Sequence, residues 1–157
     1  MLIDINNKFF ESVALLTYSH SSYKDVLTIY FLQLTKYFPQ INGYLLIDKP
    51  FPDVPSNHKV IYYDNNVYYC KHILNALNSI DEDYIIYMQD DYFFIDEPNI
   101  NILNESLFKI KSENIDFIRL IRTGDDKIDL DNIFHEISTN SKFLFSTQAT
   151  IWKKIAL

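Results

Sequence analysis

The sequence predicts an α/β layer fold with a mostly parallel sheet, and three observations lead to this class. Short apolar runs alternate along the chain with segments whose apolar residues recur at helical spacing. Several of these runs are almost continuously apolar, as expected of parallel strands covered on both faces. The 157 residues are 48% hydrophobic and 22% charged, which suits a single domain over residues 1–157.

The first predicted strand is the apolar run SVALLT at 12–17, which stops at the polar residues 18–22. A helix follows, because Ser22 and Asp25 have the spacing of a capping box and apolar residues then recur every three or four positions until Pro39. The chain therefore begins with a strand, a polar loop and a helix.

Two further strands are expected at 43–48 (GYLLID) and 58–63. The connection between them contains Pro50, Pro52 and Pro55, which exclude a helix or a central strand there.

A second helix should begin among the possible N-caps at 64–66 and end near Ile80. Its apolar stripe would consist of Val67, Cys70, Leu74 and Leu77, which places Cys70 in the core.

The run YIIYM at 84–88 predicts a central strand that ends in Gln89, Asp90 and Asp91. A third helix is expected after Pro98 and should end near Glu113, and a strand is expected at 116–122. Residues 124–132 are predicted to form a polar acidic loop, and 142–151 a last strand.

Charge and hydropathy exclude several classes of function. The net charge of −7 leaves no basic surface of the kind that binds nucleic acid. No apolar stretch is long enough to span a bilayer, and the first ten residues do not resemble a secretory leader, so we expect a cytoplasmic protein. The single cysteine cannot form an internal disulfide, which fits a reducing compartment.

Three polar clusters should meet at one edge of the sheet, because ligands of open α/β sheets bind outside the carboxyl ends of the strands. The clusters are 18–22, 64–66 and 89–91. If the strand continued through Asp90 and Asp91, their side chains would point roughly apart, one toward a divalent ion and one toward a hydroxyl. The alternative is a solvated strand end, and the spacing alone leaves the two interpretations even.

Other polar residues carry weaker signals. His20 could position a phosphate or a base, although an isolated histidine in a polar loop is more often simply exposed. Asp125 and Asp126 resemble a solvated turn. There is no glycine-rich phosphate loop, which argues against dinucleotide-binding and nucleoside-triphosphatase functions and leaves a nucleotide bound through a metal ion such as Mg²⁺ or Mn²⁺.

The segment YIIYMQDDYFFIDEP resembles the metal-binding acidic motif of family-2-like glycosyltransferases with the GT-A fold. SVALLTYSHSSY, YYDNNVYYCKHILNAL and FLFSTQATIWKK resemble, in the same order, other strands and loops of that family. The resemblance implies a three-layer, Rossmann-like α/β sandwich with a mostly parallel central sheet. It also implies a hexosyltransferase-like activity, in which a nucleotide sugar donates to a carbohydrate or other hydroxyl acceptor.

The resemblance assigns roles residue by residue. Asp91 would be the principal metal ligand, with Mn²⁺ or Mg²⁺ as the cofactor, and Asp90 would contact the donor and help at the metal. Gln89 departs from the acidic residue that some transferases have there. The remaining residues implied for donor binding are Thr17, Tyr18, Ser19, Asp64, Arg122 and Gln148.

The general base of an inverting transferase usually lies beyond the strand that FLFSTQATIWKK resembles. The resemblance therefore implies that the acceptor-binding C-terminal part is missing from this chain, which looks truncated. Asp125 or Asp126 is the alternative base within the sequence.

Two other functions stay open. A metal-dependent nucleotidyltransferase shares nucleotide and metal binding, but usually has a glycine-rich, basic first loop, whereas 18–23 contains neither Gly nor Arg. The other alternative is a non-catalytic sugar-binding or partner-binding remnant of a transferase.

Overall fold

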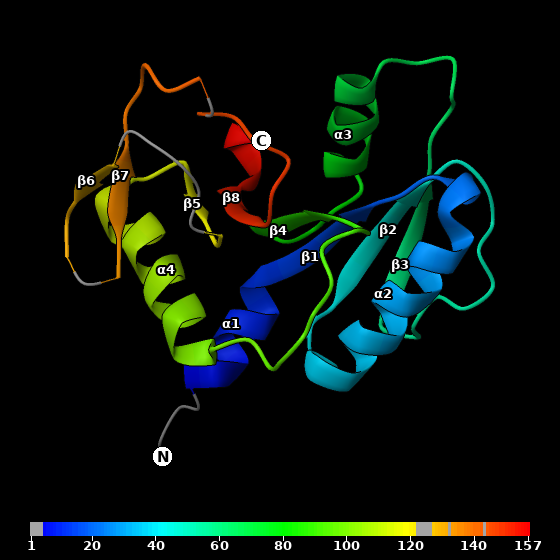
Figure 1. The fold of residues 1–157 in the computed structure, drawn as a ribbon, viewed down its shortest axis with the longest axis horizontal. Coiled ribbons are helices and arrows are strands. Elements are labelled where there is room, and N and C mark those ends of the chain that lie inside the picture. The colour runs from blue at the N-terminus through cyan, green and yellow to red at the C-terminus, as the bar shows by residue number, and fades with distance from the viewer. Residues whose placement is uncertain (1–4, 122–126, 132, 143) are drawn as a thin grey trace.

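The computed structural model describes residues 5–121, 127–131, 133–142 and 144–157. Within them, a six-stranded sheet has the order β3-β2-β1-β4-β8-β5, and β6 and β7 form a separate pair (Figure 1). The strands are β1 (Val13–Tyr18), β2 (Gly43–Ile47), β3 (His58–Tyr62), β4 (Tyr84–Gln89), β5 (Phe117–Arg119), β6 (Lys127–Asp129), β7 (His135–Ile137) and β8 (Thr150–Lys153).

The sheet is mostly parallel, as the sequence predicts. β1 pairs in parallel with β2 on one side and β4 on the other, and β2 pairs in parallel with β3. β8 is the exception, because it runs antiparallel to both β4 and β5. The carboxyl ends of β1 to β4 therefore share one edge of the sheet.

Helices cover both faces of this sheet and complete a three-layer sandwich (Figure 1). The core on one face includes residues of α1, α2 and α4, and the core on the other includes residues of α3. The helices are α1 (Ile5–Ser12), α2 (Lys24–Tyr37), α3 (Tyr69–Leu77) and α4 (Ile100–Glu113), with short 3-10 turns η1 (Ser21–Tyr23) and η2 (Lys154–Ala156).

The continuous apolar run of β1 is explained by this double coverage. Val13 and Leu15 pack in the core beneath α2 and α4, whereas Ala14 and Leu16 pack in the core beneath α3. Successive strand residues point to opposite faces, so a strand covered on both sides needs apolar side chains at every position.

The expectation for the helix after β3 is wrong in its start and its buried face. Asp64 Oδ1 accepts hydrogen bonds from the backbone N–H and the side-chain amide of Asn66, which holds the chain in a turn so that α3 begins only at Tyr69. The buried residues of α3 are His72, Ile73 and Ala76. Cys70 is exposed, contrary to the prediction that it belongs to the core.

Three further segments differ from the expectations. The helix α1 was not predicted from the sequence. The predicted loop 124–132 contains β6, which pairs with β7. The predicted strand 142–151 overlaps β8 only at Thr150 and Ile151. Before β8, Ser146 Oγ accepts from the Gln148 N–H and the Gln148 carbonyl accepts from Thr150 Oγ1, and these local hydrogen bonds replace strand pairing.

In the described part of the chain, every helix is too short or too polar to cross a lipid bilayer.

Gly43 and His58 form the tightest cross-strand pair of the sheet. They lie opposite each other in β2 and β3, and a Cβ atom on Gly43 would lie 2.3 Å from His58 Nε2. The imidazole also meets the edge of the Phe31 ring of α2, with 5.7 Å between ring centroids. A side chain at position 43 would therefore force the His58 ring to move.

Gly43→Ala should lower the free energy of unfolding by about 1–3 kcal/mol, because the added methyl group overpacks the site. Urea unfolding measures this loss. In a His58→Ala background the same substitution should be neutral or stabilising, since alanine in a strand interior is otherwise preferred over glycine. A neutral Gly43→Ala in the native background would contradict the packing described here.

Stability should depend on the protonation of His58. Its ring is buried, Nδ1 faces Asn57 Oδ1 at 3.1 Å, and Nε2 has no partner among the described residues. Burial lowers the pKa of His58 from 6.5 to about 4. Between these values the unfolded chain binds a proton that the native chain excludes, so stability falls as the pH falls.

The expected slope is up to about 1.4 kcal/mol per pH unit between pH 6.5 and 4.5, measured by urea unfolding at a series of pH values. Glutamine does not titrate in this range, so His58→Gln should remove the contribution of His58 to the pH dependence of the unfolding free energy. An unchanged slope in His58→Gln would show that other groups carry the pH dependence.

Candidate functional site

The candidate site lies where β1, β2, β3 and β4 end together. Tyr18 and Gln89, the last residues of β1 and β4, are register partners. Asp48 and Tyr63 follow β2 and β3 directly. The four polar segments after these strands therefore meet at one edge, as the topology predicts.

The acidic pair divides into one buried and one exposed side chain. β4 ends at Gln89, and a turn follows in which the Tyr92 N–H donates to the Gln89 carbonyl at 3.2 Å. In this turn Asp90 is only 8% exposed, whereas Asp91 faces solvent. The strand does not continue through the pair, but the turn still sends the two carboxylates into different surroundings.

Ser19 anchors the buried member of this pair. Ser19 Oγ donates a hydrogen bond of 2.5 Å to Asp90 Oδ2, and Ser19 itself is 2% exposed. Burial raises the pKa of Asp90, the hydrogen bond from Ser19 opposes this rise, and the neighbouring charge of Asp91 adds to it. Asp91 is thus the carboxylate that a ligand can reach directly.

Aromatic rings line the same edge between β1 and α3. The Tyr18 and Tyr63 rings stack with 5.3 Å between centroids, and the Tyr63 and His72 rings stack at 4.1 Å. Tyr69 meets Tyr18 edge-on at 5.0 Å. Parallel and edge-on contacts of this kind stabilise a cluster beyond its apolar burial.

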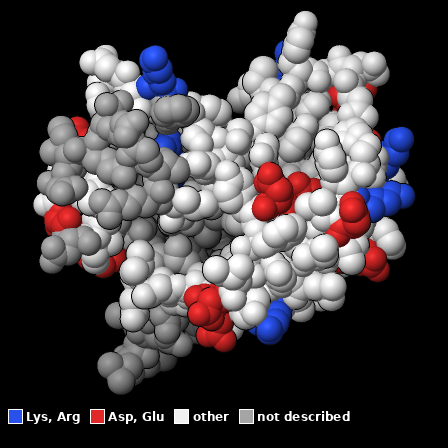
Figure 2. All heavy atoms as spheres, in the orientation of Figure 1, with Lys and Arg blue, Asp and Glu red and all other residues white. Residues whose placement is uncertain are grey.

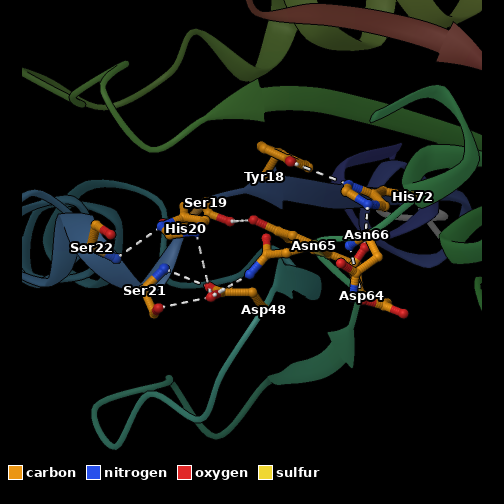
Figure 3. Close-up of polar contacts among 11 residues, drawn as sticks. Tyr18, Ser19, His20, Ser21, Ser22, Asp48, Asp64, Asn65, Asn66 and His72 are labelled. Carbon is orange, nitrogen blue, oxygen red and sulfur yellow. Dashed lines mark hydrogen bonds and ion pairs between the residues drawn. The ribbon is translucent and has the colours of Figure 1, made fainter. Parts of the chain in front are cut away.

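His72 connects this aromatic cluster to the loop after β3 (Figure 3). Its Nε2 lies 3.0 Å from the Asp64 carbonyl, and its Nδ1 lies 3.3 Å from the Tyr18 hydroxyl. Because a carbonyl can only accept, Nε2 carries the hydrogen, and in the neutral ring the Tyr18 hydroxyl donates to Nδ1. The first turns of α3 are thereby attached to β1.

Asp48 is a site residue that the sequence analysis missed, because it was counted as the last residue of a strand. Ser21 donates to Asp48 twice, through its N–H at 2.6 Å and its Oγ at 2.8 Å. Asn65 Nδ2 donates at 3.2 Å, and His20 Nε2 lies 3.5 Å away (Figure 3). The rule that ligands meet the carboxyl ends of strands could have identified it.

Asp48 is ionised in this environment. Burial raises its pKa, but the hydrogen bonds from Ser21 and Asn65 and the nearby His20 outweigh burial, and the pKa falls to about 2. His20 accepts from the Ser22 N–H through Nδ1 at 3.1 Å, so Nε2 is the nitrogen that faces the Asp48 carboxylate with a hydrogen.

The residues that were expected to bind the donor differ in how far they are exposed to solvent. Thr17 is fully buried, and its hydroxyl lies 2.9 Å from the Tyr30 hydroxyl beneath α2. Tyr18 is half-buried and Asp64 is exposed. Gln148 comes two residues before Thr150, the partner of Tyr87, so it lies near the end of β4.

The amide oxygen of Gln148 is buried without a partner among the described residues. Arg122, Asp125 and Asp126 lie outside the described residues.

The surface near the end of β4 carries acidic side chains (Figure 1, Figure 2). Figure 2 shows acidic side chains gathered near the middle of the displayed face, where β4 ends in Figure 1, within a largely uncharged surround. Among the residues that the structure describes, no three His, Cys, Asp or Glu side chains converge on one point.

No protein-family model matches the sequence, and no curated protein matches it. Solved structures match the fold. The mannosyltransferase PcManGT from Pyrobaculum calidifontis, solved with GDP-Man and Mn²⁺, aligns at 6% identity with a TM-score of 0.53. The alignment covers 71% of this chain and 36% of the PcManGT chain.

S. aureus TarS 1–349 aligns at 13% identity with a TM-score of 0.56, over 91% of this chain and 47% of its own. The fold is therefore GT-A-like over most of the chain, and the chain spans less than half the length of these proteins.

Ser19→Ala should lower the free energy of unfolding at pH 7 by about 1–3 kcal/mol, because it removes the hydroxyl that donates to the buried Asp90 carboxylate. Urea unfolding measures the loss. Ser22→Ala is the matched control, since Ser22 is exposed and makes its hydrogen bond to His20 through the backbone. Equal stability of the two variants would contradict the anchoring role of Ser19.

Proposed function

We propose that residues 1–157 form the nucleotide-sugar-binding domain of a metal-dependent glycosyltransferase that transfers a hexose to an acceptor hydroxyl. The observation that carries the proposal is the Asp90 and Asp91 pair at the carboxyl end of the central strand of a GT-A-like fold. The presence of GDP-Man and Mn²⁺ in a structure with the same fold supports it.

The donor atoms present fit a hard divalent ion. Mg²⁺ and Mn²⁺ prefer oxygen ligands, and Mg²⁺ is usually held by one or two carboxylates together with substrate phosphates and water. Asp91 is exposed and would hold the ion, while Asp90 would assist from its buried position. When bound, the ion would stabilise the negative charge of the departing diphosphate.

The remaining residues would hold the donor on either side of this pair. Tyr18 and Asp64 would contact the base or ribose, and Ser19 would act by holding Asp90. Gln148 would contact the donor sugar, since a sugar hydroxyl could satisfy its buried amide oxygen. Thr17 would support the floor of the site through Tyr30.

Arg122 keeps its proposed role near the donor sugar, and Asp125 and Asp126 stay the candidates for the general base within this sequence. A carboxylate base would take the proton of the acceptor hydroxyl as the bond to the donor breaks. The acceptor would be a carbohydrate or another molecule with a free hydroxyl.

Asp91→Asn should abolish metal-dependent binding of a nucleoside diphosphate, because it removes the exposed carboxylate charge with little change in shape. Calorimetric titration with UDP or GDP in the presence of Mn²⁺ measures this, and excess chelator should abolish binding to the native protein as well.

Asp83→Asn is the matched control, because Asp83 is an exposed aspartate just before β4, at the opposite end of the same strand. It should bind like the native protein and unfold at the same urea concentration as Asp91→Asn. Equal binding by the two variants would show that the acidic pair only solvates a strand end.

A further inference from the structure

The segment that leads into β8 carries an exposed aromatic ring on a buried support. Phe145 is 60% exposed, and its ring centroid lies 5.8 Å from that of Trp152, which is only 5% exposed. Trp152 in turn packs against Phe117 of β5, with 4.5 Å between ring centroids. Phe145 is therefore the outermost ring of an aromatic cluster built on two neighbouring strands.

Hydrogen bonds hold the backbone on both sides of this ring. Before it, the Leu144 carbonyl accepts from Arg119 Nη2 at 3.4 Å. After it, the Gln148 N–H donates to Ser146 Oγ at 3.3 Å. These contacts keep Phe145 over its aromatic support while much of the ring stays open to solvent.

The ring lies near the edge of the sheet that carries the acidic pair, on the side away from the proposed nucleotide contacts. β8 begins at Thr150, which lies opposite Tyr87, and β4 ends two residues later at Gln89. β8 also lies on the side of β4 opposite to β1 (Figure 1). Since the base and ribose would be held on the β1 side, the sugar end of the donor would point toward β8.

Phe145 is within reach of a molecule that reacts with this sugar. Gln148, the proposed contact of the donor sugar, is three residues further along the chain, and three residues span at most about 10 Å. Reacting atoms must approach to about 3–3.5 Å, so the acceptor lies directly beside the donor sugar. An acceptor ring bound there would lie close to the Phe145 side chain.

We infer that Phe145 stacks against the apolar face of a pyranose ring, so that the acceptor is a carbohydrate. A pyranose presents C–H groups on one face, and an aromatic ring attracts them by dispersion and through its negative π face. A simple alcohol has no such face. This inference rests on the proposed function, and it adds a residue of this chain to an acceptor site that was expected to be missing from it.

Saturation-transfer NMR of the full chain with the methyl pyranosides of glucose, galactose, mannose and N-acetylglucosamine tests the inference. The ring C–H protons of at least one glycoside should receive saturation, whereas glycerol, which has hydroxyl groups but no ring face, should receive none. Phe145→Ala should raise the dissociation constant of that glycoside at least about fivefold. Phe145→Tyr keeps the ring and should bind like the native protein.

Phe108→Ala is the matched control, because Phe108 is 70% exposed on α4, which covers the opposite face of the sheet. It should leave glycoside binding unchanged, and urea unfolding checks that all variants are folded. If Phe145→Ala unfolds, Phe145→Leu takes its place, since leucine keeps an apolar contact with Trp152 but lacks an aromatic face.

The possible results separate this inference from the proposed function. Absence of saturation transfer to every glycoside, or equal binding by native protein and Phe145→Ala, overturns the role of Phe145 and leaves the proposed function intact. A native dimer that becomes monomeric in Phe145→Ala, measured by sedimentation velocity, also overturns it, because a second copy would then cover the ring. Absence of UDP and GDP binding with Mn²⁺ overturns the proposed function, and with it the assignment of the bound sugar as an acceptor.

Discussion

The register between β1 and β4 is the constraint on which the candidate site depends. Tyr18 lies opposite Gln89, so the next residue on each strand, Ser19 and Asp90, can form their buried hydrogen bond. A slip of one residue would turn the apolar side chains of β1 toward the wrong cores. The burial of Leu15 and Leu16 on opposite faces thus fixes the geometry of polar groups beyond the strand end.

The pKa values of the two buried carboxylates at this edge, Asp90 and Asp48, shift in opposite directions. Asp90 has one side-chain donor, Ser19, and its pKa is raised, whereas Asp48 has several donors and its pKa is lowered. Burial favours the neutral acid in both cases, and the number of hydrogen bonds to the ionised form decides the direction. The charge of Asp48 is committed to the loop of Ser21, while that of Asp91 is available to a ligand.

The parts of the fold that could be predicted from sequence are those with a strong local pattern. The buried parallel strands and the helices that follow β1 and β4 have uninterrupted or strictly periodic apolar residues. The late start of α3 could not be predicted, because Asp64 has several possible local partners and only the packed structure selects Asn66. The β6–β7 pair could not be predicted, because each strand is only three residues long and too short to show an alternating apolar pattern.

For the site, topology predicts which loops converge, but it does not predict exposure. Thr17 and Ser19 were expected to contact the donor, but both side chains are buried, because each hydroxyl has a hydrogen-bond partner inside the protein. Asp48 shows the converse. Its side chain accepts hydrogen bonds from Ser21 and Asn65, although its sequence position resembles an ordinary strand end.

The exposure of Cys70 also makes the protein accessible to chemical labelling. It is the single thiol of the chain and lies in the first turn of α3, two residues before the ring that bonds to Tyr18 and to the loop after β3. Thiol reactivity follows exposure and thiolate content, so a maleimide dye would attach at one defined position without mutagenesis. Its fluorescence would report on the environment of α3, the helix that borders the candidate site.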